Sequence, residues 1–436
     1  MKPNGTYRAR DVDSIDARAL AAVFAVGSTV VVALDIAKRK MMAAFGDRVG
    51  TIHQVVRFDH PTQTGTFVRL LSMLRESGLT VEAVMEPTGT YGDSLRHLLT
   101  QSGIPTYRVD TKHVHDLAEV YDGVPSKHDA KDASLIAWLH AHQRSVPWLE
   151  QSESRRRMRA LVAQRELFDD PLRRLIARLE PFLARHFPEF ETFFDLSRRR
   201  TAYALLLAYP SPRDLADAPL DALLAKVAAV RRRPADPLVI ARLHAAAKHS
   251  AGVPMLDDER VFVQELAGEV LRLFARRAEV DRRIEEAASA DVAVCALRHP
   301  LGVVTAAVVV ASLGSPAEYR CAAAFEKAAG LNLREHSSGT QIGAKHISKR
   351  GPGKVRKYLF LAAMRLIQDD ERVRAWYRRR NAFLADDKAK ALIAVVRKLC
   401  RALFHVARGD TFDVAKLFDL RRLGLPVEAA PIQQEG

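Results

Sequence analysis

Apolar and polar positions alternate in two distinct ways along the chain. Between residues 28 and 142, β-branched runs predict strands at 29–35, 40–45, 54–58, 80–85 and 104–109. Helical spacing predicts helices at 67–76, 94–101 and 127–142, the first with its apolar side chains on one face. Three strands followed by alternating helices and strands is the order of an RNase H-like α/β domain.

The second half of the chain has helical spacing almost throughout. Segments 153–185 and 256–289 are long, charged and amphipathic, and they flank short helices between prolines at 201–250. They predict a helical or coiled-coil arm, with an ordinary helical hairpin as the alternative. The apolar run 303–313 is shorter than the roughly 18–20 residues of a membrane span, so we expect a buried helix.

These patterns predict an α/β domain followed by all-α structure. A chain of 436 residues is too long for one ordinary core, so two or three domains are expected. We place a loosely ordered N-terminal extension at 1–27 and the α/β domain at 28–148. The arm follows at 149–292, a mainly helical C-terminal domain at 293–410, and a tail at 411–436.

Charge and cysteine usage indicate the partners and the compartment. The net charge of +15 points to a polyanion, either nucleic acid or an anionic membrane surface. Between residues 334 and 408, 19 Lys and Arg face 6 Asp and Glu. The N-terminus lacks a secretory pattern, and the three cysteines (Cys295, Cys321 and Cys400) lie far apart. We therefore expect small buried cysteines in a reducing cytoplasm, no structural zinc and no membrane partner.

Four carboxylates stand where a metal site could form. Asp35 and Glu86 each end an apolar strand, and Asp129 and Asp132 share one face at the start of a helix. Oxygen ligands of this kind suit magnesium or manganese, and a two-metal site supports phosphoryl transfer. Alternatively, Asp35 is a turn former, Glu86 is simply exposed, and Asp129 and Asp132 are acids that the helix dipole favours at a helix N-terminus.

Basic residues accompany both candidate regions. Near the carboxylates, Lys38, Lys127 and Lys131 are either phosphate contacts or solvated surface lysines. Segment 330–365 contains Ser337 and Ser338 before a glycine, and then a series of basic side chains. Glycine permits close backbone approach to a phosphate, so the segment could bind a nucleic-acid backbone. The alternative is a flexible basic loop in which both serines are turn residues. The candidate nucleic-acid contacts of this segment are Lys345, Lys349, Arg350, Lys354, Arg356 and Lys357.

Six motifs occur together in a fixed order. The N-terminal ones are ALDIAK (33–38), VMEPTGTYG (84–92) and SKHDAKDASLIAWL (126–139). The C-terminal ones are HPLGVVTAAVVVASLG (299–314), AAGLNLREHSSGT (328–340) and HISKRGPGKVRKYLFLAA (346–363). With these motifs the chain strongly resembles the DEDD-type insertion-sequence transposases, a family of bridge-RNA-guided serine recombinases.

The resemblance implies roles for these residues. Asp35, Glu86, Asp129 and Asp132 would be the metal-binding tetrad of a RuvC-like domain, and Ser338, rather than Ser337, the nucleophile. The serine would attack a DNA phosphodiester and form a phosphoserine link. It also implies assembly from a dimer to a tetramer through the arm, donor and target DNA as substrates, and a noncoding guide RNA that selects sites by base pairing. Such an enzyme works in the bacterial cytoplasm, associated with the nucleoid.

One motif departs from its pattern, and two other functions compete. Segment 299–305 resembles a helix-hairpin-helix turn but has Gly302 followed by two valines instead of a Gly-x-Gly, which favours a packed helical turn. A RuvC-type nuclease using the carboxylates and water would leave the Ser-Gly loop unused. A nucleic-acid-binding protein without catalysis would use the carboxylates only as caps.

Overall fold

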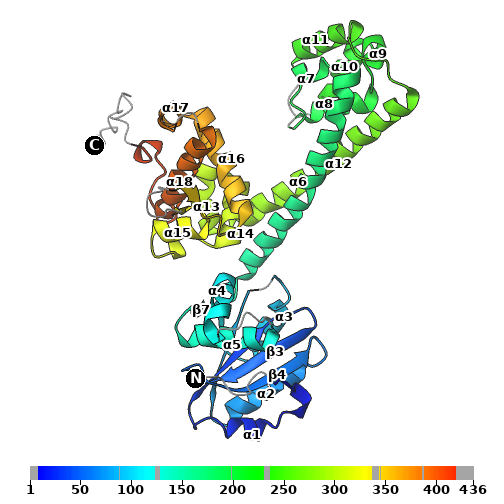
Figure 1. Ribbon diagram of the computed structural model, residues 1–436. Helices are drawn as coiled ribbons and strands as arrows, with labels where there is room; N and C mark the ends of the chain where they lie inside the picture. Colours follow the sequence, from blue (N-terminus) through cyan, green and yellow to red (C-terminus); the bar gives the residue numbers. More distant parts are fainter. Residues whose placement is uncertain are drawn as a thin grey trace. The chain divides into compact units, whose positions relative to one another are not determined.

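The computed structural model describes residues 8–87, 89–122, 128–197, 199–229, 236–335, 343, 345–384 and 387–418. The chain forms two compact units, Met1–Gln151 and Ser152–Gly436 (Figure 1). The first unit is a mixed α/β structure and the second is almost entirely helical. This confirms the predicted α/β N-terminal part and the helical remainder.

The first unit is built on a seven-stranded sheet with the order β1-β4-β3-β2-β5-β6-β7. Strands β2, β3 and β4 form an antiparallel meander, and β5 and β6 continue it in parallel with β2. The strands are β1 (Arg10–Asp11), β2 (Thr29–Asp35), β3 (Lys40–Gly46), β4 (Ile52–Asp59), β5 (Thr80–Met85), β6 (Thr106–Val109) and β7 (Ser145–Pro147). The predicted strands are confirmed, while the short edge strands β1 and β7 were not predicted.

Helices cover both faces of this sheet. Side chains alternate along β2, so Val30, Val32 and Leu34 belong to one core and Val31 and Ala33 to the other. The first core contains apolar side chains of α1 (Ala17–Ala21), α2 (Thr64–Glu76) and α3 (Asp93–Gln101). The second contains those of α4 (Thr111–Asp122) and α5 (Asp129–Ala141).

The N-terminal segment is part of this unit. Strand β1 pairs in parallel with β4, and the short helices η1 (Val12–Ser14) and α1 follow it. Val12, Leu20 and Phe24 are buried in the same core as α2. The expectation of a loosely ordered extension is therefore wrong for residues 8–27, because a few widely spaced apolar side chains anchor them.

The second unit contains two long helices and a set of shorter ones. The helices are α6 (Glu153–His186), α7 (Phe190–Phe193), α8 (Arg200–Ala208), α9 (Pro212–Asp217), α10 (Leu220–Ala228), α11 (Pro237–Lys248), α12 (Asp257–Ser289), α13 (Val292–Leu301), α14 (Val303–Leu313), α15 (Ala322–Ala328), α16 (Gly353–Asp369), α17 (Glu371–Phe383) and α18 (Lys388–Val406), with the short 3-10 helices η2 (Pro316–Glu318) and η3 (Val414–Lys416). Strands β8 (Leu333–Arg334) and β9 (His346–Ile347) form a small ribbon. The predicted long helices and the buried 303–313 helix are confirmed.

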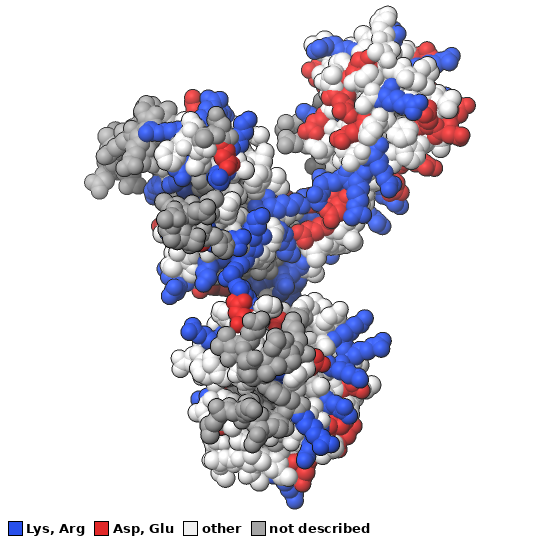
Figure 2. All heavy atoms as spheres, in the orientation of Figure 1, with Lys and Arg blue, Asp and Glu red and all other residues white. Residues whose placement is uncertain are grey.

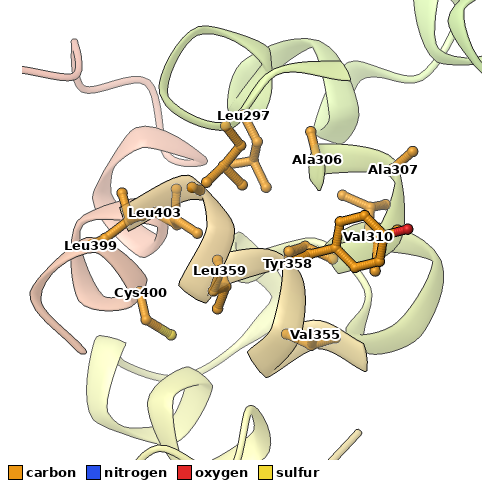
Figure 3. Close-up of a cluster of buried hydrophobic side chains, with 14 of the residues drawn as sticks. Leu297, Ala306, Ala307, Val310, Val355, Tyr358, Leu359, Leu399, Cys400 and Leu403 are labelled. Atoms are coloured by element: carbon orange, nitrogen blue, oxygen red, sulfur yellow. The ribbon is translucent and has the colours of Figure 1, made fainter. Parts of the chain in front are cut away.

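Helices α6 and α12 pack along each other and enter two hydrophobic cores (Figure 1). The C-terminal half of α6 and the N-terminal half of α12 pack with α7 to α11 around side chains such as Tyr203 and Phe190. Their other portions pack with α13, α14, α16 and α18, where Leu359, Leu399 and Leu403 lie together (Figure 3). No helix in the described part of the chain is both long enough and apolar enough to cross a membrane.

Candidate functional site

The sheet brings Asp35 and Glu86 side by side. In the parallel register Leu34 lies opposite Met85, so the residues that follow, Asp35 and Glu86, leave neighbouring strands at the same edge. By alternation both continue the row of Ala33 and its neighbours on the face that α5 covers. Two carboxylates therefore meet at one end of this face.

Helix α5 begins at this end of the sheet. The His128 Nδ1 accepts a hydrogen bond from the backbone N–H of Lys131 at 3.1 Å and caps the helix. The cap fixes the first turn, which holds Asp129 and Asp132. The helix dipole favours acidic residues at that position. His128 is a positioning residue that sequence reasoning missed, because histidine is not among the usual cap residues.

The four carboxylates act on one another. Burial raises the pKa of Asp35 to about 7, with further rises caused by the negative charges of Asp132, Asp129 and Glu86. The backbone N–H of Ile36 partly opposes this rise. Like charges within reach of one another disfavour ionisation, so this pKa indicates that all four predicted acids share one neighbourhood.

The donor set suits a hard cation. Among the described residues, no three His, Cys, Asp or Glu side chains form a cluster with metal-binding geometry. The four carboxylates nevertheless offer only oxygen ligands, and a bound divalent cation would relieve their mutual repulsion. Their chemistry would therefore fit magnesium or manganese, with Asp35 among the residues that could hold the ion.

The three lysines predicted beside the carboxylates have different surroundings. Lys38 is exposed just after β2. Lys127 lies outside the described residues. Lys131 is fully buried, which corrects the expectation of a surface lysine. Helix α5 turns the Lys131 side chain into the protein, and its role as a phosphate contact stays a prediction.

In the sequence, the predicted nucleophile falls between the two strands of the small ribbon. Leu333 pairs with Ile347 and Arg334 with His346, so β8 and β9 bracket residues 335–345. Ser337 and Ser338 fall in this bracketed segment but lie outside the described residues. Beyond β9, the backbone N–H of Lys349 donates to the carbonyl of Gly330 at 3.0 Å and closes the base of the ribbon.

Comparison with known proteins identifies the family. Residues 32–188 match a model of DEDD transposases of IS110 type, and residues 300–378 match the transposase family IS116/IS110/IS902. The chain belongs to the IS110 family of transposases. A Streptomyces coelicolor relative, the insertion element IS110 uncharacterized 43.6 kDa protein, is 27% identical over 316 residues, which is 69% of this chain and 75% of the relative. The transposase is therefore an enzyme that acts on DNA.

The predicted basic contacts of the transposase in this segment lie just before β9, between β9 and α16, and on α16. Lys349 and Arg350 are exposed, and Arg356 donates to the carbonyl of Gly351 at 2.8 Å. Lys345 lies 3.2 Å from Glu335, and Lys354 lies 3.6 Å from Glu166 on α6. On the face seen in Figure 2, Lys and Arg gather around the start of α6 and around α14 and α16, whereas acidic and basic side chains mix over α7 to α11.

A network of ion pairs joins α16 of the transposase to the long helices. The Asp169 carboxylate on α6 forms ion pairs with Arg165, Arg277 and Lys357, at N–O distances of 3.2, 3.5 and 3.5 Å. The Arg165 guanidinium also donates to the Tyr358 hydroxyl at 2.6 Å. Lys357 is thus a structural partner of α6 as well as a candidate DNA contact. Sequence reasoning missed Asp169, because its partners come from three separate helices.

The buried Glu82 forms a set of polar contacts between β5 and α5 of the transposase. Glu82 on β5 accepts a hydrogen bond from Arg48 at 2.6 Å and lies 3.3 Å from the His140 Nε2. The ring of His140 packs edge-on against Tyr107, with centroids 4.8 Å apart. These contacts fix the C-terminal half of α5, and its N-terminal half holds Asp129 and Asp132. The network is therefore a support for the carboxylate site.

The cysteines match the expectation only in part. Cys400 is buried in the core that contains α18, whereas Cys295 is exposed and Cys321 is half-buried. The prediction of three buried cysteines is therefore wrong for Cys295, which lies on α13. All three are free thiols.

Proposed function

We propose that the transposase cuts and rejoins DNA through a covalent link between DNA and Ser338. In this proposal Asp35, Glu86, Asp129 and Asp132 hold the divalent cation, which is magnesium or manganese. The observation on which the proposal rests is the raised pKa of Asp35, caused by burial and by the other three acids. Clustered acids of this kind are costly unless a cation or a catalytic role compensates for them.

The fold of the first unit supports a RuvC-like, RNase H-like domain. The antiparallel strands β2, β3 and β4 precede the parallel strands β5 and β6, with helices on both faces. In that arrangement the acids stand at the ends of the two central strands and on the helix beside them. A nuclease-type active site would require them at that location.

The proposed covalent step exchanges one ester for another. The Ser338 Oγ forms a bond to phosphorus while the bond from phosphorus to one deoxyribose oxygen breaks. The serine proton is released, and the leaving oxygen takes up a proton. The phosphoserine ester conserves the bond energy for rejoining. A cation held by the carboxylates would supply positive charge for the phosphate and the leaving oxygen.

Assembly and guidance complete the proposal. The two catalytic parts belong to different units, Met1–Gln151 and Ser152–Gly436. We propose that a dimer or tetramer, formed through the arm of α6 and α12, unites Ser338 with the carboxylates. We further propose that a noncoding RNA selects donor and target sites by base pairing. The net charge of +15 supports binding to such polyanions.

Trapping the covalent link tests this mechanism. Purified protein with its bound RNA is incubated with end-labelled donor and target DNA and magnesium, then denatured in detergent. We expect a labelled protein–DNA adduct from wild type and from Ser337→Ala, and none from Ser338→Ala. Asp132→Asn should also abolish it. Cutting by Ser338→Ala without any wild-type adduct would instead establish a water-using nuclease.

Sequencing of RNA that co-purifies with the protein tests the guidance. We expect one defined RNA with segments complementary to donor and target. A sample treated with ribonuclease should lose sequence-specific cutting. Full activity after complete RNA removal would overturn the guided part of the proposal, while leaving the serine mechanism intact.

A further inference from the structure

A cavity of about 330 Å³ lies between α6, α14 and α16. This α14–α16 cavity begins just after Gly302, the single residue that joins α13 to α14 with φ +73°. Its polar lining includes Thr305, Tyr358, Arg165 and Arg365, and no carboxylate lines it. The cavity therefore combines an apolar lining with basic and hydroxyl groups, and its volume is in the size range of small-ligand sites.

Two of these side chains face the cavity with polar groups that no carboxylate of the described residues pairs with. Thr305 is only 6% exposed, and its hydroxyl has no hydrogen-bond partner among the residues that the structure describes. Arg365 donates to the carbonyl of Leu301 at 2.6 Å but forms no ion pair within the described part of the chain. A hydroxyl and an exposed guanidinium without an ion pair, facing one cavity that no carboxylate lines, together favour an anionic ligand.

The remaining lining residues indicate what kind of anion the cavity would bind. Arg165 pairs with Asp281 at 2.6 Å and with Asp169 at 3.2 Å and donates to the Tyr358 hydroxyl, so its positive charge is largely compensated inside the protein. In Figure 3 this hydroxyl lies at the margin of the apolar cluster. Leu361 and Met364, which are 45% and 38% exposed, line the same opening. An anion with an adjoining apolar surface, such as a sugar phosphate, matches this combination.

We propose that the α14–α16 cavity binds one phosphodiester of a nucleic-acid backbone, with Arg365 and Thr305 on the phosphate and Leu361 and Met364 against the adjoining sugar. Side chains thereby replace the Gly-x-Gly backbone that the turn lacks. The site requires that the transposase binds nucleic acid, but it does not depend on the serine or metal chemistry. It would fix the backbone of DNA or RNA beside α16.

Binding without catalysis tests the site. Full-length protein is titrated into fluorescent duplex DNA and, separately, a fluorescent RNA stem-loop, in EDTA and over a series of salt concentrations. Thr305→Val should weaken binding about tenfold, since it removes one hydrogen bond to a charged group. Arg365→Gln should lower the slope of log affinity against log salt by about 1.

A second Arg→Gln change, away from the cavity, controls for the effect of lowering the protein's net positive charge by one. Arg276 on α12 is exposed, does not line the cavity and forms no ion pair among the described residues, so Arg276→Gln should leave the slope unchanged. If the Thr305 and Arg365 variants bind only DNA or only RNA more weakly, that nucleic acid occupies the cavity. Weaker binding of both means that the cavity recognises the phosphodiester that they share. Wild-type affinity and slope for both nucleic acids in a folded Arg365→Gln protein would overturn the site, even if Thr305→Val fails to fold. Ser338→Ala should bind like wild type, which separates this test from the proposed mechanism.

Discussion

Replacing Asp35 by asparagine should stabilise the first unit at pH 8 when no metal is present, although the change removes a proposed ligand. Burial and the charges of Asp132, Asp129 and Glu86 raise the pKa of Asp35 from 3.8 to about 7 in the folded protein. The unfolded chain ionises this group near pH 4, whereas the folded protein resists ionisation. Wild-type stability should therefore fall as pH rises from about 4 to 7, and an asparagine should not show this fall.

The magnitude follows from the pKa difference. Each pH unit between 3.8 and about 7 corresponds to about 1.4 kcal/mol, which sets an upper limit of about 4 kcal/mol. The carboxylate is only partly buried, so solvent screening reduces this limit. We expect the Asp35→Asn protein to gain about 2 kcal/mol in free energy of unfolding at pH 8 and close to nothing at pH 4.

Tryptophan fluorescence can isolate this unit. Trp138 and Trp148 lie in the first unit and Trp376 in the second, so a Trp376→Phe background reports urea unfolding of the first unit alone. Asp59→Asn, which changes the exposed last residue of β4, is the control and should show no pH-dependent gain. Magnesium should stabilise wild type more than Asp35→Asn. Equal stability of wild type and Asp35→Asn at pH 8 in EDTA would refute the gathering of the four acids.

Three further changes test the second unit. Gly351→Ala should destabilise it by about 2 kcal/mol in thermal melts, because a Cβ there would lie 2.3 Å from the carbonyl oxygen of Ala328 at a φ of +151°. Asp169→Asn should cost about 2 kcal/mol in urea unfolding, because three cations lose their shared carboxylate, and an unchanged midpoint would contradict that role. Thiol titration at pH 8 should modify Cys295 quickly and leave Cys400 unreactive until unfolding, since burial raises the pKa of Cys400; rapid labelling of Cys400 would contradict its position in the core.

The sequence predicted most of the fold because most of its elements are long and periodic. Strand β2 was predicted with the bounds that the structure has, and helices α6 and α12 to within one or two residues. Strands β1 and β7 were missed because two or three residues contain no period. Helix α4 was missed as well, since its apolar positions are few and polar residues separate them.

The candidate site was partly accessible from the sequence. Asp35 and Glu86 end neighbouring parallel strands, so strand order alone brings them together. The burial of Lys131 was not predictable, because it depends on which side of α5 faces the sheet. The contact between Glu82 and His140 likewise depends on tertiary packing between β5 and α5. The role of Ser338 stays a prediction.

The sharing of α6 and α12 between two hydrophobic cores has a consequence for how the protein can be divided or recombined. The matched stretch 300–378 packs on Met158, Leu161 and Ile284, which lie far outside it in the sequence. The stretch is therefore matched as one sequence region, but it does not contain a complete hydrophobic core. A chimera that exchanges only 300–378 between relatives would retain one half of a core shaped for the other parent. Viable exchanges would have to include the adjoining turns of both long helices.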